Sequence, residues 1–479
     1  RIDELHDIGY NRTISMMDSI KSRIHRRVNL DNIRLRRMVY RSNFPELRFK
    51  NIIIDGANPQ QQAYMKKEFH KSDNKEFTYE DLKQGYFRLL SDKMISEIIP
   101  HAIYNPEDDT YDLHLKVKLE NNFAVRLGGN ISTSNSNQIY LGLSYQDLNY
   151  YAKEFILDGQ LGKVYNNVQF MAKIDFATAI PTSYRLIGSI STFDYFKKDK
   201  LFSRNNKPAF NQKDERFLKL QVGLPFLSSK RAEFGVGIAR IEDKYFQKSV
   251  IDFGNDKFDK SRYDLFGGSI SFNGSTLNSK QYPTRGYREA LVAQIFVGKE
   301  RFYPGEGSTT SNNKDHHSWL QLSYMKEKYH NMSEHWVLGW YLKALYASKN
   351  FSENYTATMM QAGEFSPTLH SKLTYNEAFR ANQFVGAGIR PIYRLSQMFH
   401  LRGEFYGFMP IYPIEKNSLN KAYYGKAFSK FEYLGEISVV CQLPFGDISA
   451  YVNHYSSPKR EWNVGLSIGW QLFNYRFIE

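Results

Sequence analysis

The stretch His400–Tyr406, with the sequence HLRGEFY, carries a polar side chain at every second position. Successive side chains of a β-strand point to opposite faces of a sheet, so this stretch is predicted to have one polar and one apolar face. The polar face would hold His400, Arg402, Glu404 and Tyr406, and the apolar face Phe399, Leu401 and Phe405. Such a strand fits the wall of a closed barrel in a lipid bilayer, with water inside and acyl chains outside.

The same alternation recurs from Phe123 to the end of the chain. It is clearest from Trp462 to Leu472, where the apolar residues occupy every second position, and this last strand is expected to end on the aromatic Phe473. Segments of about ten residues match the length that a tilted strand needs to cross the hydrocarbon core. A soluble β-sandwich also alternates, so the pattern alone leaves two fold classes open.

The lengths of the connections separate these classes. About sixteen strands are predicted, and long polar connections alternate with short ones. The long connections are 194–212, 243–262, 299–316, 347–382 and 409–430, and the short ones are 225–231, 330–334, 394–397 and 443–446. Strict alternation puts all long connections at one end of the sheet, which is typical of an up-and-down outer-membrane barrel. A large soluble up-and-down barrel is the alternative.

Composition excludes several other classes of protein. The 479 residues include 34 Tyr and 35 Phe, and aromatic girdles flank the apolar band of outer-membrane barrels. The mean hydropathy is −0.54, and no apolar run approaches the roughly 18 residues of a membrane helix. The net charge of +14 comes from scattered Lys and Arg, so no nucleic-acid partner is expected. The single cysteine, Cys441, permits no internal disulfide.

The first 120 residues follow a different pattern. Apolar residues recur at helical spacing from Asp3 to Arg27, which predicts a helix interrupted near Gly9. A β-α-α-β-β order follows, with strands at 48–56, 98–104 and 110–118 and helices at 59–70 and 79–94. Thr78 and Asp81 are predicted to form a capping box. This order resembles a POTRA domain, the periplasmic module that precedes the barrels of the Omp85 family.

A second resemblance lies in the turn Tyr282-Pro283-Thr284-Arg285-Gly286. It is similar to the Phe-Pro-Thr-Arg-Gly segment of many Omp85 barrels. Its predicted position, between strands eight and nine on the side of the short turns, makes it a marker of that family. A proline–glycine turn without family meaning is the alternative.

The third resemblance is Phe379-Arg380-Ala381-Asn382, at the end of the sixth external loop and directly before strand twelve. Its position is similar to the Omp85 loop motif Val-Arg-Gly-Phe/Tyr, although Ala381 replaces the glycine and the aromatic is missing. The resemblance implies that Arg380 points into the lumen, where a buried guanidinium needs a carboxylate. Glu404 is the expected partner, with Glu436 on strand fourteen as a second choice. A solvated surface arginine is the alternative.

The N-terminal helix, followed by one POTRA-like unit, resembles the junction of patatin–Omp85 fusions, in which a phospholipase domain precedes one POTRA domain and a 16-stranded barrel. The resemblance implies three parts. Residues 1–28 would end an upstream patatin-like domain, 29–120 would form the POTRA-like domain and 121–479 the barrel. The barrel would then anchor, export or position an upstream lipase.

Catalytic residues are not expected in this chain. Patatin chemistry needs a Gly-x-Ser-x-Gly elbow, which the sequence lacks. Asp55-Gly56-Ala57 matches the patatin aspartate motif by letters only and is predicted to be a strand-to-helix turn. His316-His317 and Glu334-His335 are predicted at opposite ends of the barrel, so no metal site and no cofactor are expected. Any enzyme activity would belong to the upstream domain.

The chain is therefore predicted to be mainly β: a 16-stranded antiparallel transmembrane β-barrel after a small α+β POTRA domain and an N-terminal helix. The expected location is the bacterial outer membrane, with the small domain in the periplasm. The alternative function is an Omp85-type translocation or assembly pore, with client polypeptides or chaperones paired to the POTRA edge by β-augmentation. A diffusion porin is a third possibility. The other expected partners are outer-membrane lipid and a second copy joined through the upstream domain.

Overall fold

The structure is a computed structural model of the chain. It describes residues 2–24, 29–42, 46–69, 76–133, 136–176, 180–195, 211–227, 229–247, 257–306, 308, 311–457 and 462–479. The predicted helix ends at Arg27 and His70 lie outside the described residues. The chain divides into two compact units: residues 1–57, 72–91 and 95–118 make the first, and residues 58–71, 92–94 and 119–479 make the second.

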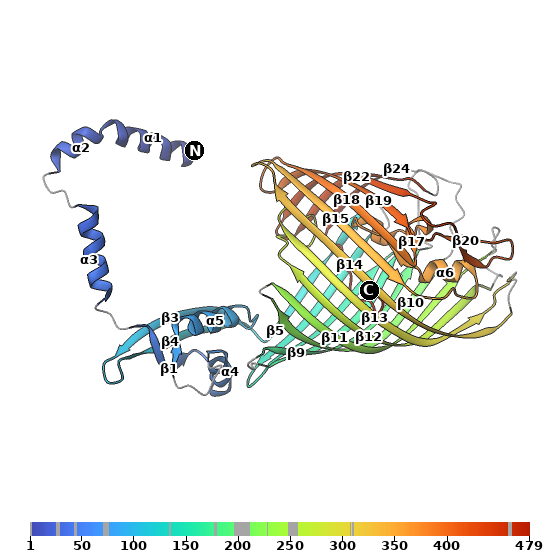
Figure 1. Cartoon of the computed structure of the whole chain (residues 1–479), viewed down its shortest axis with the longest axis horizontal. Helices are drawn as coiled ribbons and strands as arrows, with labels where there is room; N and C mark the ends of the chain where they lie inside the picture. The colour runs from blue at the N-terminus through green and yellow to red at the C-terminus, as the bar shows by residue number, and fades with distance from the viewer. Residues whose placement is uncertain are drawn as a thin grey trace. The chain divides into compact units, whose positions relative to one another are not determined.

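Sixteen strands of the described chain close into an antiparallel barrel (Figure 1), which confirms the predicted fold class. In chain order they are β5 (Phe123–Ser132), β6 (Gln138–Leu148), β7 (Ala152–Gly162), β8 (Tyr165–Phe176), β9 (Thr182–Asp194), β10 (Asn211–Phe226), β11 (Lys230–Tyr245), β12 (Asp259–Ser275), β13 (Gly286–Tyr303), β14 (Asn313–Asn331), β15 (Trp336–Ala347), β18 (Gln383–Arg394), β19 (Phe399–Pro410), β22 (Glu432–Leu443), β23 (Gly446–Tyr455) and β24 (Trp462–Gly469). Each pairs with its neighbours in sequence, and β24 pairs with β5.

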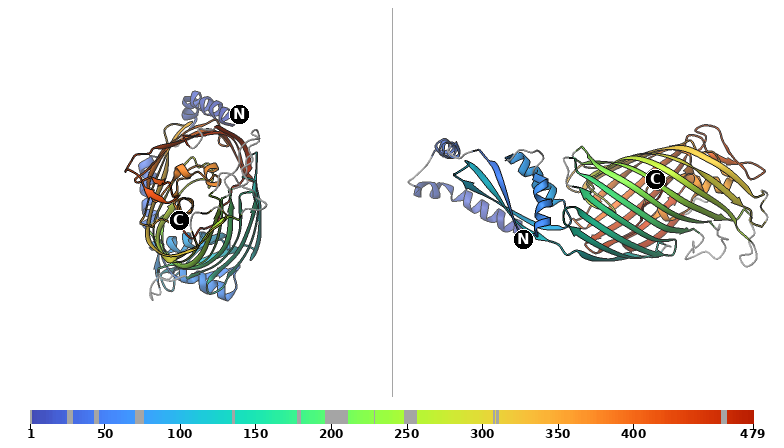
Figure 2. Two further views of the ribbon diagram at one scale, coloured as in Figure 1. Left: turned by 90° about the vertical axis from the view of Figure 1, so that its right-hand side faces the viewer. Right: turned by 90° about the horizontal axis from the view of Figure 1, so that it is seen from below.

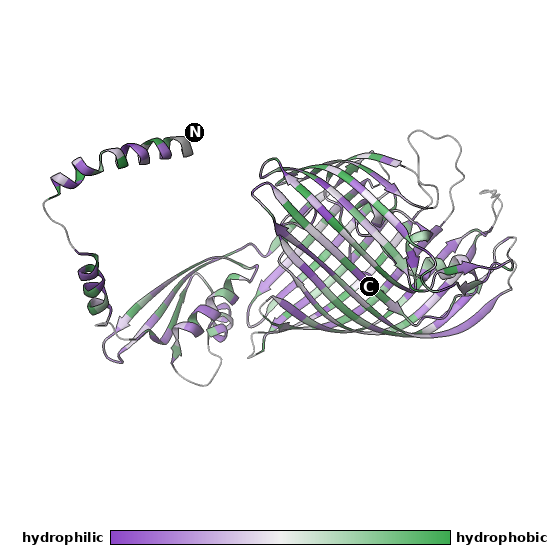
Figure 3. Cartoon of the chain, turned by 45° about the horizontal axis from the view of Figure 1, so that its top comes forward, coloured by the Kyte–Doolittle hydropathy of each residue, from purple (hydrophilic) through white to green (hydrophobic). Residues whose placement is uncertain are grey.

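The two faces of the strands differ as the alternation predicts. On β19 the polar residues His400, Arg402, Glu404 and Tyr406 are all buried inside the barrel, whereas Phe399, Leu401 and Phe405 are exposed on its outer face. Figure 3 shows apolar and polar residues alternating along the other strands in the same way. An exposed apolar outer face on a closed sheet, which leaves no backbone edge in lipid, is the form in which β-structure spans a membrane.

The seam between the first and last barrel strands is short. Three residue pairs join β24 to β5, Ser467↔Ser132, Ile468↔Ile131 and Gly469↔Asn130, whereas seventeen join β13 to β14. The prediction that the last strand continues to Phe473 is wrong. Gly469 has a φ of +113°, and an added Cβ there would lie 2.2 Å from the carbonyl oxygen of Gly129, so glycine lets the chain leave the wall at this point.

The loop between β15 and β18, residues 348–382, folds into the ring of strands (Figure 2, left). It contains α6 (Tyr355–Gln361), the 3₁₀ turns η1 (His370–Leu373) and η2 (Glu377–Phe379), and the two-residue strands β16 (Gly363–Glu364) and β17 (Arg380–Ala381). The next long loop holds β20 (Ile414–Lys416) and β21 (Ala422–Tyr424). The buried Met359 and Met360 of α6 show that this loop is packed rather than solvated.

The β-α-α-β-β order predicted before the barrel is present. It consists of β1 (Arg48–Asp55), α4 (Pro59–Phe69), α5 (Tyr79–Leu90), β3 (Ile95–Asn105) and β4 (Thr110–Leu119), with the short β2 (Phe77–Thr78) added before α5. The sheet order is β2-β1-β4-β3, and Thr78 and Asp81 form the predicted capping box. The second helix ends at Leu90 rather than Met94. The boundaries 29–120 and the POTRA assignment stay predictions.

In the described part of the chain before this sheet there are three helices, α1 (Ile2–Ser15), α2 (Met17–Arg23) and α3 (Leu30–Ser42). The first break falls at Met16, so the interruption predicted near Gly9 is wrong, and α3 was not predicted. Apolar side chains such as Leu5, Ile8 and Leu30 are more than half exposed on these helices. Among the described residues, no helix combines the length and apolar character needed to cross a bilayer.

Candidate functional site

Arg380 is buried, and it lies between barrel strands eleven and twelve as predicted. Its ion-pair partner is not the expected Glu404. Where β16 pairs with β17, Arg380 stands directly opposite Glu364, and its Nη2 donates to Glu364 Oε2 at 2.9 Å. Its Nη1 donates to the main-chain oxygens of Met359, Met360 and Ala362 at 3.3–3.5 Å. Arg380 therefore closes the loop on itself and covers the C-terminal end of α6.

The charge on Arg380 is well compensated. Burial opposes the charged form, but Coulombic interactions, first with Glu364 and then with Tyr375, hold the pKa of Arg380 above its ordinary value. The guanidinium carbon lies 4.7 Å from the Tyr375 ring centroid. The arginine is thus a cation at any physiological pH, held inside the loop by one carboxylate, one ring and three carbonyl groups.

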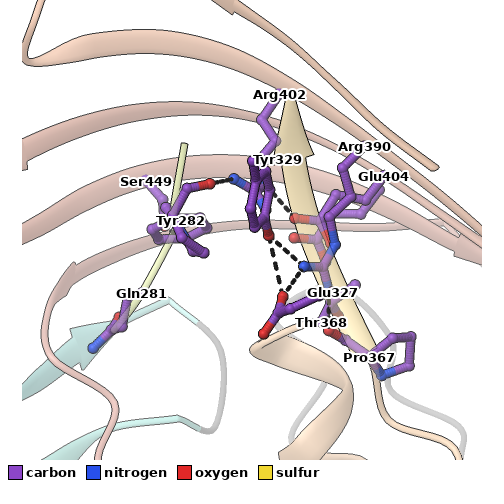
Figure 4. A network of polar contacts seen from close by, with 12 residues as sticks. Gln281, Tyr282, Glu327, Tyr329, Pro367, Thr368, Arg390, Arg402, Glu404 and Ser449 are labelled. Atoms are coloured by element: carbon purple, nitrogen blue, oxygen red, sulfur yellow. Dashed lines mark hydrogen bonds and ion pairs between the residues drawn. The ribbon is translucent and has the colours of Figure 1, made fainter. Parts of the chain in front are cut away.

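Glu404 belongs instead to a buried network on the inner wall of β14, β18 and β19 (Figure 4). Arg402 donates its Nε to Glu404, and the Tyr406 hydroxyl donates to the second carboxylate oxygen. Arg390 Nε lies 3.6 Å from Glu404 and donates to Tyr406 at 2.6 Å. Arg390 also pairs with Glu327 and contacts Tyr329. The pairing of Arg380 with Glu404 is wrong because these nearer cations already occupy the carboxylate.

The network holds two chain segments that enter the lumen. Arg390 Nη2 donates to the main-chain oxygen of Pro367 in the loop, at 3.2 Å. Arg402 Nη1 donates to the main-chain oxygen of Pro283, at 2.8 Å, in the turn between β12 and β13. One cluster of side chains therefore fixes both a loop from one end of the barrel and a turn from the other.

The turn Tyr282–Gly286 lies between barrel strands eight and nine, as expected. Tyr282, Pro283 and Thr284 are buried, Arg285 is exposed, and Gly286 begins β13. The Tyr282 hydroxyl donates to Ser449 Oγ on β23 at 3.0 Å. The main-chain N–H groups of Thr284 and Arg285 donate to Asn278 Oδ1 at 3.0 and 2.9 Å. These contacts turn the motif inward rather than leaving it as a solvated connection.

Glu436, the second partner considered for Arg380, faces Glu404 directly across the β19–β22 ladder. It does not contact Arg380. Its two carboxylate oxygens each lie 3.1 Å from His370 Nδ1 of the loop, and Asn453 Nδ2 donates to it at 3.4 Å. Two carboxylates side by side would repel, and their separate partners on the wall and on the loop offset this repulsion.

Sequence reasoning missed Arg390, Glu327 and Tyr329 as members of the network. One signal was available for Arg402, which shares the polar face of its strand with Glu404. Within the described chain, no three His, Cys, Asp or Glu side chains are arranged to hold a metal ion. Charged groups that are paired with one another and buried are suited to holding loops in place.

No protein-family model and no curated protein sequence matches this chain. Among solved structures, it is similar to BamA from Haemophilus ducreyi lacking POTRA domains 1–3, with a TM-score of 0.59 and 12% identity over 88% of this chain and 84% of that chain. It is also similar to CdiB from Acinetobacter baumannii, with a TM-score of 0.51 and 9% identity over 88% of this chain and 74% of that chain. At such low identities the similarity shows the fold alone. The shared fold agrees with the predicted outer-membrane location. The chain is thus structurally similar to BamA and CdiB and shares the fold of their barrels.

Proposed function

We propose that this chain is the membrane part of an Omp85-type patatin-like phospholipase, and that its barrel anchors and positions an upstream lipase domain at the outer membrane. The observation that carries the proposal is a barrel with an apolar outer face whose lumen is taken up by its own chain. The loop 348–382 and the turn 276–285 both enter it and are bound there by buried ion pairs and hydrogen bonds. Such a barrel suits anchoring better than free diffusion of solutes.

The N-terminal helices support a domain joined at that end. Leu5, Ile8 and Leu30 expose 65–70% of their surface, and apolar side chains of amphipathic helices are normally covered by a partner. In the proposed protein a patatin-like domain covers them, with the POTRA-like unit in the periplasm. The same proposal includes a homodimer in which two copies of the protein associate through their lipase domains.

The experiment compares the natural full-length protein with a variant that lacks residues 123–479. Phospholipase activity and the protein itself are followed through membrane fractionation. We expect the full-length protein to hydrolyse phospholipid in the outer-membrane fraction, and the variant to lose its membrane association. A full-length protein without a Gly-x-Ser-x-Gly motif and without lipase activity would contradict the proposal.

A second candidate function, an assembly or translocation pore for other polypeptides, is favoured by the short seam. The edge of β5 from Phe123 to Gly128 has no ladder partner on the β24 side among the described residues. An unpaired strand edge can accept a strand from another polypeptide, and leaving it open in lipid is costly.

A disulfide across the seam separates the two functions. The variant Ile131→Cys with Ile468→Cys, in a Cys441→Ser background, joins residues that face each other across β5 and β24. If the chain is only an anchor, the barrel with the disulfide is expected to keep all of the lipase activity in the outer-membrane fraction. If it assembles or exports polypeptides, those polypeptides are expected to accumulate until the disulfide is reduced.

A further inference from the structure

The segment Trp470–Glu479 turns from β24 into the lumen and runs along the inner wall from β6 to β14; its end is marked C inside the ring of strands in Figure 2, left. Its contacts follow the order of the strands. Leu472 bonds to β6, Asn474 to β7 and β8, Tyr475 to β8, Phe477 to β10 and β13, and Glu479 to β10, β13 and β14.

Glutamine side chains of the wall bind the main chain of this segment. Gln138 uses both amide atoms on Leu472: its Oε1 accepts from the N–H and its Nε2 donates to the carbonyl oxygen, each at 3.0 Å. Gln294 does the same further along, accepting from the N–H of Glu479 at 3.0 Å and donating to the oxygen of Phe477 at 3.1 Å. A carboxamide that holds N–H and C=O groups binds an extended chain with little regard to its side chains.

Only one side chain of the last six residues is fully buried. Phe477 exposes 2% of its surface and packs against Phe217 and Phe296, with ring centroids 5.9 and 5.7 Å away. Two wall glycines make room for it, because a Cβ on Gly237 or Gly267 would lie 3.0 or 3.1 Å from the Phe477 ring. The wall therefore carries a pocket that fits one aromatic side chain.

The rest of the segment is held shallowly. Tyr475 is 45% exposed, and Arg476 and Glu479 are also exposed. Glu479 forms an ion pair with the buried Lys219 at 3.2 Å. Arg476 lies 3.9 Å from Glu364 of the loop and 4.5 Å from the centroid of the Phe193 ring. The segment is thus attached mainly by hydrogen bonds and one fully buried aromatic anchor, with ion pairs only at the part-exposed Arg476 and Glu479. A groove can hold an exchangeable peptide in this way.

We propose that the inner wall from β6 to β14 is a peptide-binding groove and that residues 470–479 are its removable occupant. Its ligands are extended peptides with one aromatic side chain for the Phe477 pocket. When the segment leaves, the glutamines and the pocket become free for a peptide supplied by another molecule. The proposal goes beyond the proposed function, since it holds for an anchor and for an assembly pore alike.

The test uses a fluorescein-labelled peptide with the sequence of residues 470–479 and the full chain purified in detergent. A variant lacking residues 470–479 is expected to bind the peptide, as measured by fluorescence anisotropy. The intact chain is expected to bind about tenfold or more weakly, because its own segment competes at a high effective concentration. A second variant, Phe477→Ala in the intact chain, is expected to bind with intermediate affinity, and it serves if the deletion prevents folding.

Two changes examine the groove itself. Gln294→Ala in the deletion variant and a peptide carrying the Phe477→Ala change are each expected to weaken binding about tenfold. Gln221→Ala is the matched control. Gln221 is a buried wall glutamine on β10 that, within the described chain, makes no hydrogen bond to the segment, and its loss is expected to leave binding unchanged. Absence of binding to both folded variants overturns the proposal. So does equal binding of the Phe477→Ala peptide, or equal effects of Gln294→Ala and Gln221→Ala.

Discussion

Two parts of the inner wall hold chain segments in different ways. The wall of β14, β18 and β19 uses buried charges: Arg390, Arg402, Glu327 and Glu404 hold the loop 348–382 and the turn 276–285. The wall of β6 and β8 uses neutral amides, among them Gln138 and Gln169, to hold the segment 470–479. Charged groups out of water are costly when a partner leaves, whereas a lost amide contact costs little.

The difference teaches which contents of the lumen are permanent. A segment held by buried ion pairs stays in place, because its release would leave charges without partners. The segment 470–479 is held mostly by neutral amides, with ion pairs only at the part-exposed Arg476 and Glu479, so most of its contacts can be exchanged for contacts with water or with another peptide. The wall of β6 and β8, which we call the amide wall, lies next to the short seam between β24 and β5. The shortest strand pairing of the barrel and the amide contacts to segment 470–479 are therefore close together.

The largest effect is expected for Glu404→Ala. Removal of the carboxylate leaves Arg402 without its buried anion, and breaking such a pair costs about 3–5 kcal/mol. The unfolding free energy is measured in detergent, and heat-modifiable gel mobility gives a second readout. Phe405→Leu, the next residue on the lipid-facing side, is the control and is expected to cost less than about 1.5 kcal/mol. If Glu404→Ala and the wild type unfolded at the same temperature, the buried charges of β14, β18 and β19 would not stabilise the barrel, and this prediction would be wrong.

The pair inside the loop comes next. Arg380→Ala and Glu364→Ala are each expected to destabilise the barrel by about 2 kcal/mol, with a coupling energy of about 1–3 kcal/mol in the double variant. Arg380→Ala combined with Glu404→Ala is expected to be additive, since the two residues share no contact. A coupling energy between Arg380 and Glu404, with none between Arg380 and Glu364, would instead support the Arg380–Glu404 pairing expected from the sequence.

The loop also gives a pH dependence. Burial, and then the neighbouring Lys213, lower the pKa of Lys349 to about 7. The unfolded chain therefore binds a proton that the folded chain lacks above this pKa, so stability rises with pH. The gain is about 1 kcal/mol between about pH 7 and about pH 8. It continues until the ordinary lysine pKa is reached. Lys349→Met is expected to flatten this part of the stability profile, and an unchanged slope in that variant would assign the titration to another group.

The smallest effect is expected on the amide wall. Gln138→Ala removes two hydrogen bonds to Leu472 and should cost about 1 kcal/mol. The readout is local: hydrogen exchange of the amides of residues 472–479 is expected to become faster, while the charged wall is unaffected. Gln221→Ala is again the control. If Gln138→Ala destabilised the barrel as much as Glu404→Ala, the distinction between the two walls would not hold.

Alternation and connection lengths were enough to predict the barrel, because each strand must be polar inside and apolar outside. The polar set of β19 is buried as that rule requires. The family resemblance predicted that Arg380 points inward, but it did not identify Glu364 as the ion-pair partner of Arg380. Glu364 meets Arg380 only because the two-residue strands β16 and β17 pair inside the loop, and strands that short have no period to detect. The turn of the last strand was missed for a related reason, since the apolar alternation continues through Leu472 although Gly469 has already ended the strand.

The short strands at the seam also act on the surrounding lipid. β24 has 8 residues and β5 has 10, against 19 in β14. At roughly 3.3 Å per residue, β24 is roughly 26 Å long. A tilt of about 45° leaves it roughly 19 Å of depth, less than the hydrocarbon thickness of about 30 Å. The acyl chains beside the seam must therefore compress to cover the exposed Val464 and Leu466, so a patch of thinner bilayer is expected on the side of the barrel where β24 meets β5.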